Sequence, residues 1–235
     1  MPFSDEALAR LEADAAQIIA RYPRSRSALL PLLHLVQSEE GHVSTDGIAF
    51  CAAQLGLTEA EVTGVATFYT MYKRNPAGEY HVGVCTNTLC AVMGGDAIYA
   101  SLTEHLDVGH NEATPDGKIS LERVECNAAC IYAPVVMVNW EFFDNMTPAS
   151  ARALVDDLKA GREVTPSRGP RHLCTWREAS RILAGQPDGQ ATDGPAAGPA
   201  DLVGLKIAKE RGWSAPAADG GSGANSAESA GSEAQ

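Results

Sequence analysis

Four of the six cysteines form two pairs, and their spacing constrains this chain more than any other feature. Cys85 and Cys90 enclose four residues, Cys126 and Cys130 enclose three, and 35 residues lie between the pairs. Each pair follows a segment with strand character, so the two loops can converge on one site. Four thiolates at one point repel one another and are stable only around a positive centre. The candidates are zinc and an iron-sulfur cluster.

The number of residues inside each pair bears on which of the two centres is favoured. Structural zinc sites most often use pairs with two intervening residues, and neither pair has that spacing. The wider gaps favour a two-iron cluster in which each pair serves a different iron. A redox dithiol is disfavoured because neither pair is Cys-x-x-Cys. The residues alone therefore favour a [2Fe-2S] cluster that carries single electrons, and they leave a structural zinc site as the alternative.

The other two cysteines have simpler interpretations. Cys51 lies on the apolar face of a predicted helix at 48–55, and we interpret it as a small core residue. Cys174 lies in a basic stretch that would lower its pKa, but we expect no functional thiol there. We expect the basic residues of that stretch to dock against an acidic partner surface; they are Arg168, Arg171, Arg177 and Arg181. None of the six histidines is assigned any chemistry.

Residues 1–75 are predicted to form a helical domain. Apolar residues recur at helical spacing from Leu8 to Ile19, and a second helix is predicted over 27–40. We place Leu29, Leu30, Leu33 and Val36 on the buried face of that second helix. A third helix is predicted at 48–55, and a capping-box pattern at 58–61 opens a fourth that runs towards Phe68.

The periodicity changes in residues 76–165. Short strands are predicted at 80–84, 118–124, 135–139 and 141–143, with helices at 95–106 and 148–160. This order suits a small mixed sheet with flanking helices, as in thioredoxin-like domains. The sequence therefore predicts an α+β fold in which an N-terminal helical bundle precedes a thioredoxin-like domain.

The C-terminal part is different in kind. A short helical region is expected at 166–184, before a tail at 185–235 in which Gly, Ala and Pro make up 26 of 51 residues. Such a tail has too little bulky apolar surface to offset the entropy of ordering, so we expect it to be mostly disordered. One apolar island from Leu202 to Trp213 interrupts it and is either a partner anchor or ordinary linker sequence.

The charge balance excludes some classes of partner. The chain has 18 basic and 30 acidic residues, a net charge of −12, which argues against binding nucleic acid through its phosphates. Residues 50–68 resemble a helix-turn-helix, but no Lys or Arg lies between Ser44 and Thr70. The apolar runs are too short to span a bilayer, and the acidic start is unlike a secretory signal. We therefore expect a cytoplasmic protein with no direct membrane insertion.

The cysteine segments resemble the family of the 24 kDa [2Fe-2S] subunit of respiratory complex I, the NADH-quinone oxidoreductase. The resemblance covers about residues 10–165. It is carried by the matching stretches at 81–90 (HVGVCTNTLC), 117–121 (GKISL), 124–130 (VECNAAC) and 133–135 (APV).

This resemblance implies a thioredoxin-like ferredoxin fold with one [2Fe-2S] cluster, whose ligands are Cys85, Cys90, Cys126 and Cys130. It implies a partner subunit that binds NADH and FMN, together with other peripheral-arm subunits of complex I. The cluster would exchange single electrons with that FMN, and this chain would hold no complete active site and no catalytic residue. The sequence has no Gly-rich dinucleotide fingerprint, which agrees with this division of labour. The chain would then lie on the cytoplasmic side of the inner membrane, attached through the complex.

Two alternatives remain open. Related subunits of NAD-linked hydrogenases and formate dehydrogenases have the same ligand pattern, and the four cysteines do not separate these assemblies. A structural zinc scaffold without redox chemistry is the alternative from another class.

Overall fold

The computed structural model of the chain describes residues 3–190 and 193–214. Contacts divide the chain after Gly198 into two units, residues 1–198 and 199–235, and each is described by itself. Among the described residues, no helix has the length and apolar character needed to cross a membrane.

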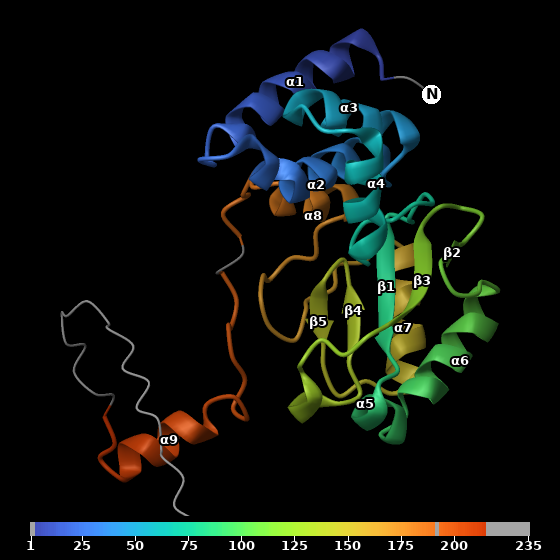
Figure 1. The fold of residues 1–235 in the computed structure, drawn as a ribbon. Helices are drawn as coiled ribbons and strands as arrows, with labels where there is room; N and C mark the ends of the chain where they lie inside the picture. The colour runs from blue at the N-terminus through green and yellow to red at the C-terminus, as the bar shows by residue number, and fades with distance from the viewer. Residues whose placement is uncertain (1–2, 191–192, 215–235) are drawn as a thin grey trace, which may run out of the picture. The chain divides into compact units, whose positions relative to one another are not determined.

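The first unit begins with four helices and a 3-10 turn at Ser25–Ala28. The helices are α1 (Asp5–Ile19), α2 (Leu29–Glu40), α3 (Thr45–Leu55) and α4 (Glu59–Phe68) (Figure 1). Local side chains set the helix ends: Ser44 accepts a backbone hydrogen bond at 2.9 Å, and Thr58 and Glu61 form the predicted capping box. Gly41 ends α2 in the left-handed conformation, with φ of 80°.

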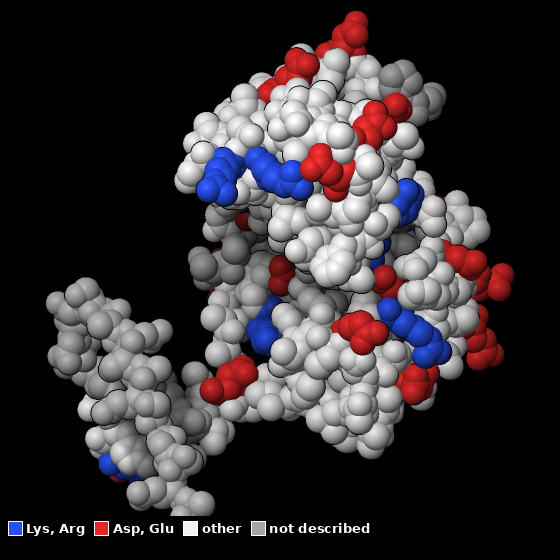
Figure 2. Space-filling model, in the orientation of Figure 1, with Lys and Arg blue, Asp and Glu red and all other residues white. Residues whose placement is uncertain are grey.

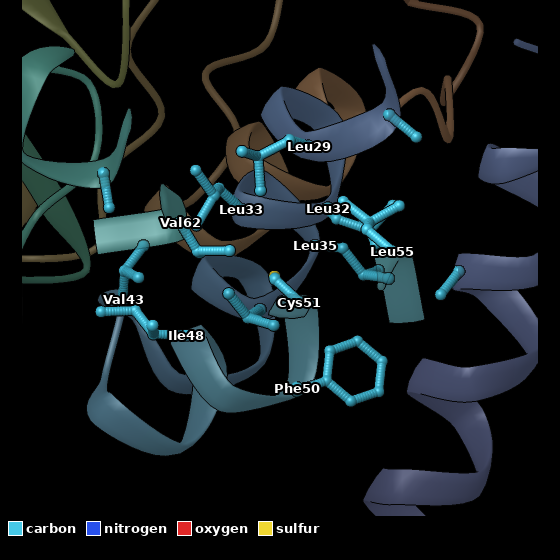
Figure 3. Packing of buried hydrophobic residues seen from close by; sticks show 14 of the residues in the cluster. Leu29, Leu32, Leu33, Leu35, Val43, Ile48, Phe50, Cys51, Leu55 and Val62 are labelled. Atoms are coloured by element: carbon cyan, nitrogen blue, oxygen red, sulfur yellow. The ribbon is translucent and has the colours of Figure 1, made fainter. Parts of the chain in front are cut away.

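These helices enclose a core of their own, built mainly from α2 and α3 (Figure 3). The predicted burial of Leu30 was wrong: its side chain is 40% exposed, while Leu32 and Leu35 are fully buried. Helix α2 packs against α1 and α3 and also against a later helix, and this wider contact accounts for the burial of Leu32 and Leu35, which the single predicted stripe left out. Cys51 is a core residue as predicted, and burial raises the pKa of its thiol to about 12.

A five-stranded sheet forms the second part of this unit. The strands are β1 (Tyr80–Cys85), β2 (Glu112–Ala113), β3 (Ile119–Val124), β4 (Val136–Val138) and β5 (Glu141–Phe143). Their spatial order is β2-β3-β1-β4-β5, with β1 and β3 parallel and all other pairs antiparallel. Strand β2, which is only two residues long, was not predicted from the sequence. The mixed sheet and its flanking helices confirm the predicted α+β, thioredoxin-like architecture.

Three helices accompany the sheet: α5 (Thr88–Val92), α6 (Gly95–Leu106) and α7 (Pro148–Lys159). The first of them was not predicted. Helices α6 and α7 pack against each other on one face of the sheet (Figure 1) and share a core with β1, β3 and β4. Fully buried members of this core are Val82, Val84, Ile98, Leu102, Ile119, Leu121, Val136, Val138, Ala151 and Val155. This core fixes the strands whose ends carry the cysteine loops.

Helix α8 (Trp176–Leu183) brings the chain back to the N-terminal helices and packs against α2. Trp176 is 1% exposed, and its Nε1–H donates to the carbonyl of Gly41 at 2.8 Å. Gln37 of α2 donates to Ser180 Oγ at 3.3 Å. The region predicted at 166–184 therefore contains a helix, and this helix packs against the core of the N-terminal helices, which lie far away in the sequence.

A buried polar cluster joins the loop after α4 to the sheet. Lys73 Nζ donates to Glu122 Oε2 at 2.6 Å, and His81 Nε2 lies 2.8 Å from the same oxygen. His81 Nδ1 is 2.9 Å from Ser120 Oγ. These groups line a cavity of about 260 Å³. No role was assigned to His81 from the sequence, and the structure gives it a structural one, because each ring nitrogen lies within hydrogen-bond distance of a polar partner.

The lowered pKa expected for the Cys174 thiol was wrong. Burial raises the pKa of this thiol to about 11, and nearby carboxylates add to the shift. The four arginines are engaged within the chain: Arg168 with Asp144, Arg171 with Asp193, Arg177 with the carbonyl of Glu39, and Arg181 with Asp14. Each of the four arginines therefore has an acceptor within the chain, and their docking against an acidic partner stays a prediction.

Charge is scattered over the face of the molecule drawn in Figure 2. On the face drawn in Figure 2, acidic side chains are spread widely, and the basic ones lie in small separate groups. Several basic side chains are paired with carboxylates, such as Arg26 with Glu61 at 2.8 Å and Arg10 with Glu39 at 2.9 Å. Among the described residues of this face, the basic side chains form no continuous groove of the kind that follows a phosphate backbone.

The second unit is described only as far as residue 214. It contains α9 (Val203–Glu210), which lies inside the apolar island Leu202–Trp213 noted in the sequence. The predicted disordered tail at 185–235 falls partly on residues 191–192 and 215–235, which lie outside the described residues.

One prediction concerns the close approach of α6 to the first cysteine loop. A Cβ at Gly95 would lie 2.5 Å from the Cys85 carbonyl oxygen and 2.9 Å from that of Cys90. Gly95→Ala should therefore lower stability by about 1–3 kcal/mol, measured by denaturant unfolding. Gly64→Ala in α4 is the matched control, because no atom lies within 4 Å of the Cβ that it would add. This variant should be more stable than the wild type by roughly 0.5–1 kcal/mol, since alanine is the better helix former. A Gly95→Ala variant as stable as the wild type would contradict this packing.

A second prediction concerns His34, which is 8% exposed and has no described partner for Nδ1; its ring lies tilted against that of Tyr72, with 4.8 Å between the ring centroids. Burial lowers the pKa of His34 from 6.5 to about 4. Below pH 6.5 the His34 imidazole is protonated in the unfolded chain but stays neutral in the folded chain. The free energy of unfolding therefore falls as the pH decreases from 6.5 towards 4. His34→Phe should shrink the stability difference between pH 7 and pH 5 by about 2 kcal/mol. Parallel pH profiles for the two proteins would refute the assignment.

Candidate metal centre

The parallel pairing of β1 and β3 brings the two cysteine loops together. The two strands pair in register from Tyr80 opposite Ile119 to Cys85 opposite Val124. Their carboxyl ends therefore meet at one edge of the sheet, and the loop that follows each strand starts there. A separation of 35 residues between the cysteine pairs in sequence becomes a short distance in space.

Each cysteine is placed by a different local element. Cys85 is the last residue of β1, Cys90 lies in α5, Cys126 follows β3, and Cys130 begins a 3-10 turn that ends at Tyr132. All four line one cavity of about 350 Å³, as the sequence led us to expect. Cys85 and Cys90 are buried, Cys130 is partly buried and Cys126 is exposed. The cavity therefore has a closed side and an open side.

The second pair has a geometry suited to a shared metal. The sulfurs of Cys126 and Cys130 are 3.5 Å apart, close to the about 3.8 Å expected for two thiolates bound tetrahedrally to one ion at about 2.3 Å. The Ala128 N–H donates to Cys126 Sγ at 3.4 Å. Ala128 adopts a left-handed conformation with φ of 57°, which is uncommon for a residue other than glycine. This turn directs a backbone donor at a sulfur, as the small residues of the loop had suggested.

The pKa values of two of the thiols, Cys90 and Cys130, are raised. Burial raises the pKa of Cys90 to about 11, and a hydrogen bond and charge interaction with Cys85 add to the shift. The pKa of Cys130 is also raised, through its hydrogen bond with Cys126 and the nearby charge of that sulfur. Four thiolates in this cavity therefore need a positive centre to compensate their charge. The donor set fits a thiolate-bound metal centre.

The rest of the cavity wall is partly apolar. Leu89 and Val92 of α5 line it and are 45% and 79% exposed. Neither residue was singled out from the sequence, because α5 is too short to give a periodic signal. Two large apolar side chains at an open mouth are the kind of surface that a partner protein covers.

Asn87 is the other residue at this site that sequence reasoning missed. Its Oδ1 accepts the Cys126 N–H at 2.9 Å, and its Nδ2 donates to Glu125 Oε2 at 2.7 Å. The side chain thus spans the two cysteine loops. The only available signal was an asparagine two residues after Cys85, a position that predicts a helix cap just as well.

The cavity does not include the remaining cysteines, because Cys51 lies in the helical core and Cys174 lines a separate cavity of about 820 Å³. Within residues 3–190 and 193–214, no three His, Cys, Asp or Glu side chains converge as the ligands of a single ion would. The four sulfurs are instead spread over the cavity in two pairs.

Comparison with known proteins gives a consistent result. The model of the thioredoxin-like [2Fe-2S] ferredoxin family matches residues 15–159. The E subunit of NADH-quinone oxidoreductase from Mycobacterium tuberculosis (strain ATCC 25618 / H37Rv) is 59% identical over 219 residues, covering 93% of this chain and 86% of that protein. NADH-quinone oxidoreductase subunit 2 of Thermus thermophilus is 40% identical over 151 residues, covering 63% of this chain and 83% of that protein.

Among solved structures, the NAD+-reducing [NiFe]-hydrogenase in the H2-reduced state matches 56% of this chain and 22% of its own chain, with a TM-score of 0.51. At 20% identity this likeness shows the fold alone. The sequence relatives and the family match carry the assignment: the chain belongs to the thioredoxin-like [2Fe-2S] ferredoxin family and, within it, to the family of the E subunits of NADH-quinone oxidoreductase.

Proposed function

We propose that Cys85, Cys90, Cys126 and Cys130 hold one [2Fe-2S] cluster, through which this chain exchanges single electrons with the FMN of a partner NADH-binding subunit. The observation that carries the proposal is that all four sulfurs line one cavity at the carboxyl ends of a parallel strand pair. Their arrangement as two pairs suits two irons better than a single ion. The names of the family and of the relatives agree with this cofactor and with an oxidoreductase complex.

When bound by four thiolates, a [2Fe-2S] cluster supplies a one-electron centre of low potential. The residues of the chain bind it and adjust its surroundings. Cys85 and Cys90 anchor the buried side, and the Ala128 N–H directs its dipole at the Cys126 sulfur. Such a donor favours the more negative, reduced state and raises the potential. The cluster bound by this chain would hold one electron, and the bond-breaking chemistry would take place on a partner subunit.

The open side of the cavity supports a partner at that position. Leu89 and Val92 present apolar surface at the mouth, where exclusion of water would favour electron exchange with a cofactor bound by another subunit. We place NADH and FMN on that subunit and further peripheral-arm subunits around it. The chain would lie on the cytoplasmic side of the inner membrane through the complex and would hold no complete active site.

We also propose a functional division of the chain. Residues 1–75 form the helical domain, residues 76–165 carry the cluster, residues 166–184 are a helical return, and residues 185–235 are a tail. The separate cores of the N-terminal helices and the sheet support the first boundary. The contacts between α8 and α2 make the helical return a structural part of the first domain.

Two measurements test the proposed function. The anaerobically purified chain should be brown, contain equal amounts of iron and sulfide, and give an S = 1/2 signal on one-electron reduction. A colourless protein with zinc would overturn the proposal and favour the scaffold. Purification from the native host separates the assemblies: a quinone-linked complex with an FMN-binding partner is expected, and a hydrogenase or formate dehydrogenase would identify the alternative diaphorase role.

A matched pair of variants tests the ligand assignment. Cys126→Ser should lose or remodel the cluster, because a serine oxygen replaces one of four thiolate ligands. Cys51→Ser should keep the iron content and lose about 1–3 kcal/mol of stability, because it buries a hydroxyl in an apolar core. Iron analysis and the spectrum of the reduced protein measure the first effect, and denaturant unfolding measures the second. Equal cluster loss in both variants would show that the ligands are misassigned.

A further inference from the structure

Asn87 occupies a helix-capping position without capping the helix. It is the N-cap residue of α5, with extended backbone angles of φ −76° and ψ 164°. An asparagine in this position normally accepts a hydrogen bond from a backbone N–H of the first helical turn. Its side chain makes no such bond here. The Asn87 side chain therefore does not stabilise the start of α5, and its carboxamide can make another contact.

The carboxamide instead reaches the other cysteine loop. Its oxygen accepts the backbone N–H of Cys126 at 2.9 Å, and its nitrogen donates to Glu125 Oε2 at 2.7 Å. Asn87 lies between Cys85 and Cys90, whereas Glu125 and Cys126 belong to the second loop. One side chain thus makes two hydrogen bonds between segments that are 38 and 39 residues apart.

Cys126 is the cysteine that most needs such a constraint. It is the one exposed member of the four, and it lies outside any helix or strand. The turn that follows contains Ala128 in a left-handed conformation, which costs energy in a residue with a side chain. The bond to Asn87 fixes the backbone of Cys126 at the start of this turn, so its sulfur faces the cavity that the other three line.

We propose that Asn87 is a positioning residue that locks the Cys126 loop onto the Cys85–Cys90 loop and thereby holds the fourth ligand in place for the cluster. This inference rests on the proposed function for the identity of the bound group. The geometric part of it concerns only the Cys126 amide and can be measured independently of the metal. Glu125 has a second effect, because its carboxylate is held next to a ligand and makes reduction less favourable.

Three variants distinguish the bridge that Asn87 makes between the loops from a role as N-cap of α5 and from the effect of charge near Cys126. Asn87→Ser keeps a good N-cap residue for α5 but is too short to bridge the loops. Asn87→Asp keeps an oxygen that can accept the Cys126 N–H, while it loses the donor to Glu125 and adds a negative charge. Glu125→Gln keeps an acceptor for Asn87 Nδ2 and removes a negative charge. All three variants leave the four proposed ligands unchanged.

The readouts are hydrogen exchange of the 124–130 peptide, iron release to a chelator under anaerobic conditions, and the midpoint potential of the full chain. Asn87→Ser should exchange the Cys126 amide faster and release iron on the order of tenfold faster, as the loss of one hydrogen bond predicts. Asn87→Asp should leave this amide better protected than Asn87→Ser does but less than the wild type, because the new carboxylate is repelled by Glu125, and it should shift the potential downwards. Glu125→Gln should keep the iron release rate and shift the potential upwards.

Contrary results fall into two distinguishable groups. Wild-type exchange and wild-type iron release in Asn87→Ser would overturn the positioning role while leaving the proposed function intact. Purified wild-type chain without iron would overturn the proposed function. In that case faster exchange at the Cys126 amide in Asn87→Ser would still support the hydrogen bond from Cys126 to Asn87, and unchanged exchange would contradict it.

Discussion

The in-register parallel pairing of β1 and β3 is the constraint on which the site depends. It places Cys85 opposite Val124, so the loops that carry the two cysteine pairs leave the sheet at the same edge. The core under these strands is completed by α6 and α7, and Gly95 allows the start of α6 to approach the first loop closely. A shift of one residue in this register would move the side chains of a strand to the opposite face and separate the sulfurs.

Charge is the second constraint on the site. The chain is acidic overall, and it gathers four groups whose ionised forms repel one another in a partly buried cavity. Burial of Cys90 and the hydrogen bond of Cys130 with the Cys126 sulfur raise the pKa values of these two thiols, and the charge of the neighbouring sulfurs adds to both shifts. The iron-sulfide core is positively charged as a whole and would compensate the charge of the four thiolates. The small residues of the loops leave backbone N–H groups that can donate to the sulfurs.

Sequence reasoning succeeded where the signal was local. The capping box at Thr58, the helix from Gly95 to Leu106 and the role of Cys51 all follow from short-range patterns. It failed where distant contacts decide the outcome. One predicted apolar stripe on α2 left out Leu32 and Leu35, because it could not show that α8 also covers this helix, and the arginines near Cys174 have acceptors within the chain that the sequence did not indicate. Asn87 was missed because its partners lie in the other cysteine loop, and no local pattern reports such a pairing.

Mössbauer spectroscopy of the chain enriched in 57Fe tests the central claim most directly, because it reports the number, oxidation state and ligands of the irons together. The account predicts two ferric irons in tetrahedral sulfur coordination, coupled to a diamagnetic ground state, and one ferric and one ferrous iron after uptake of one electron. A single isolated iron, or oxygen and nitrogen coordination at both irons, would contradict it.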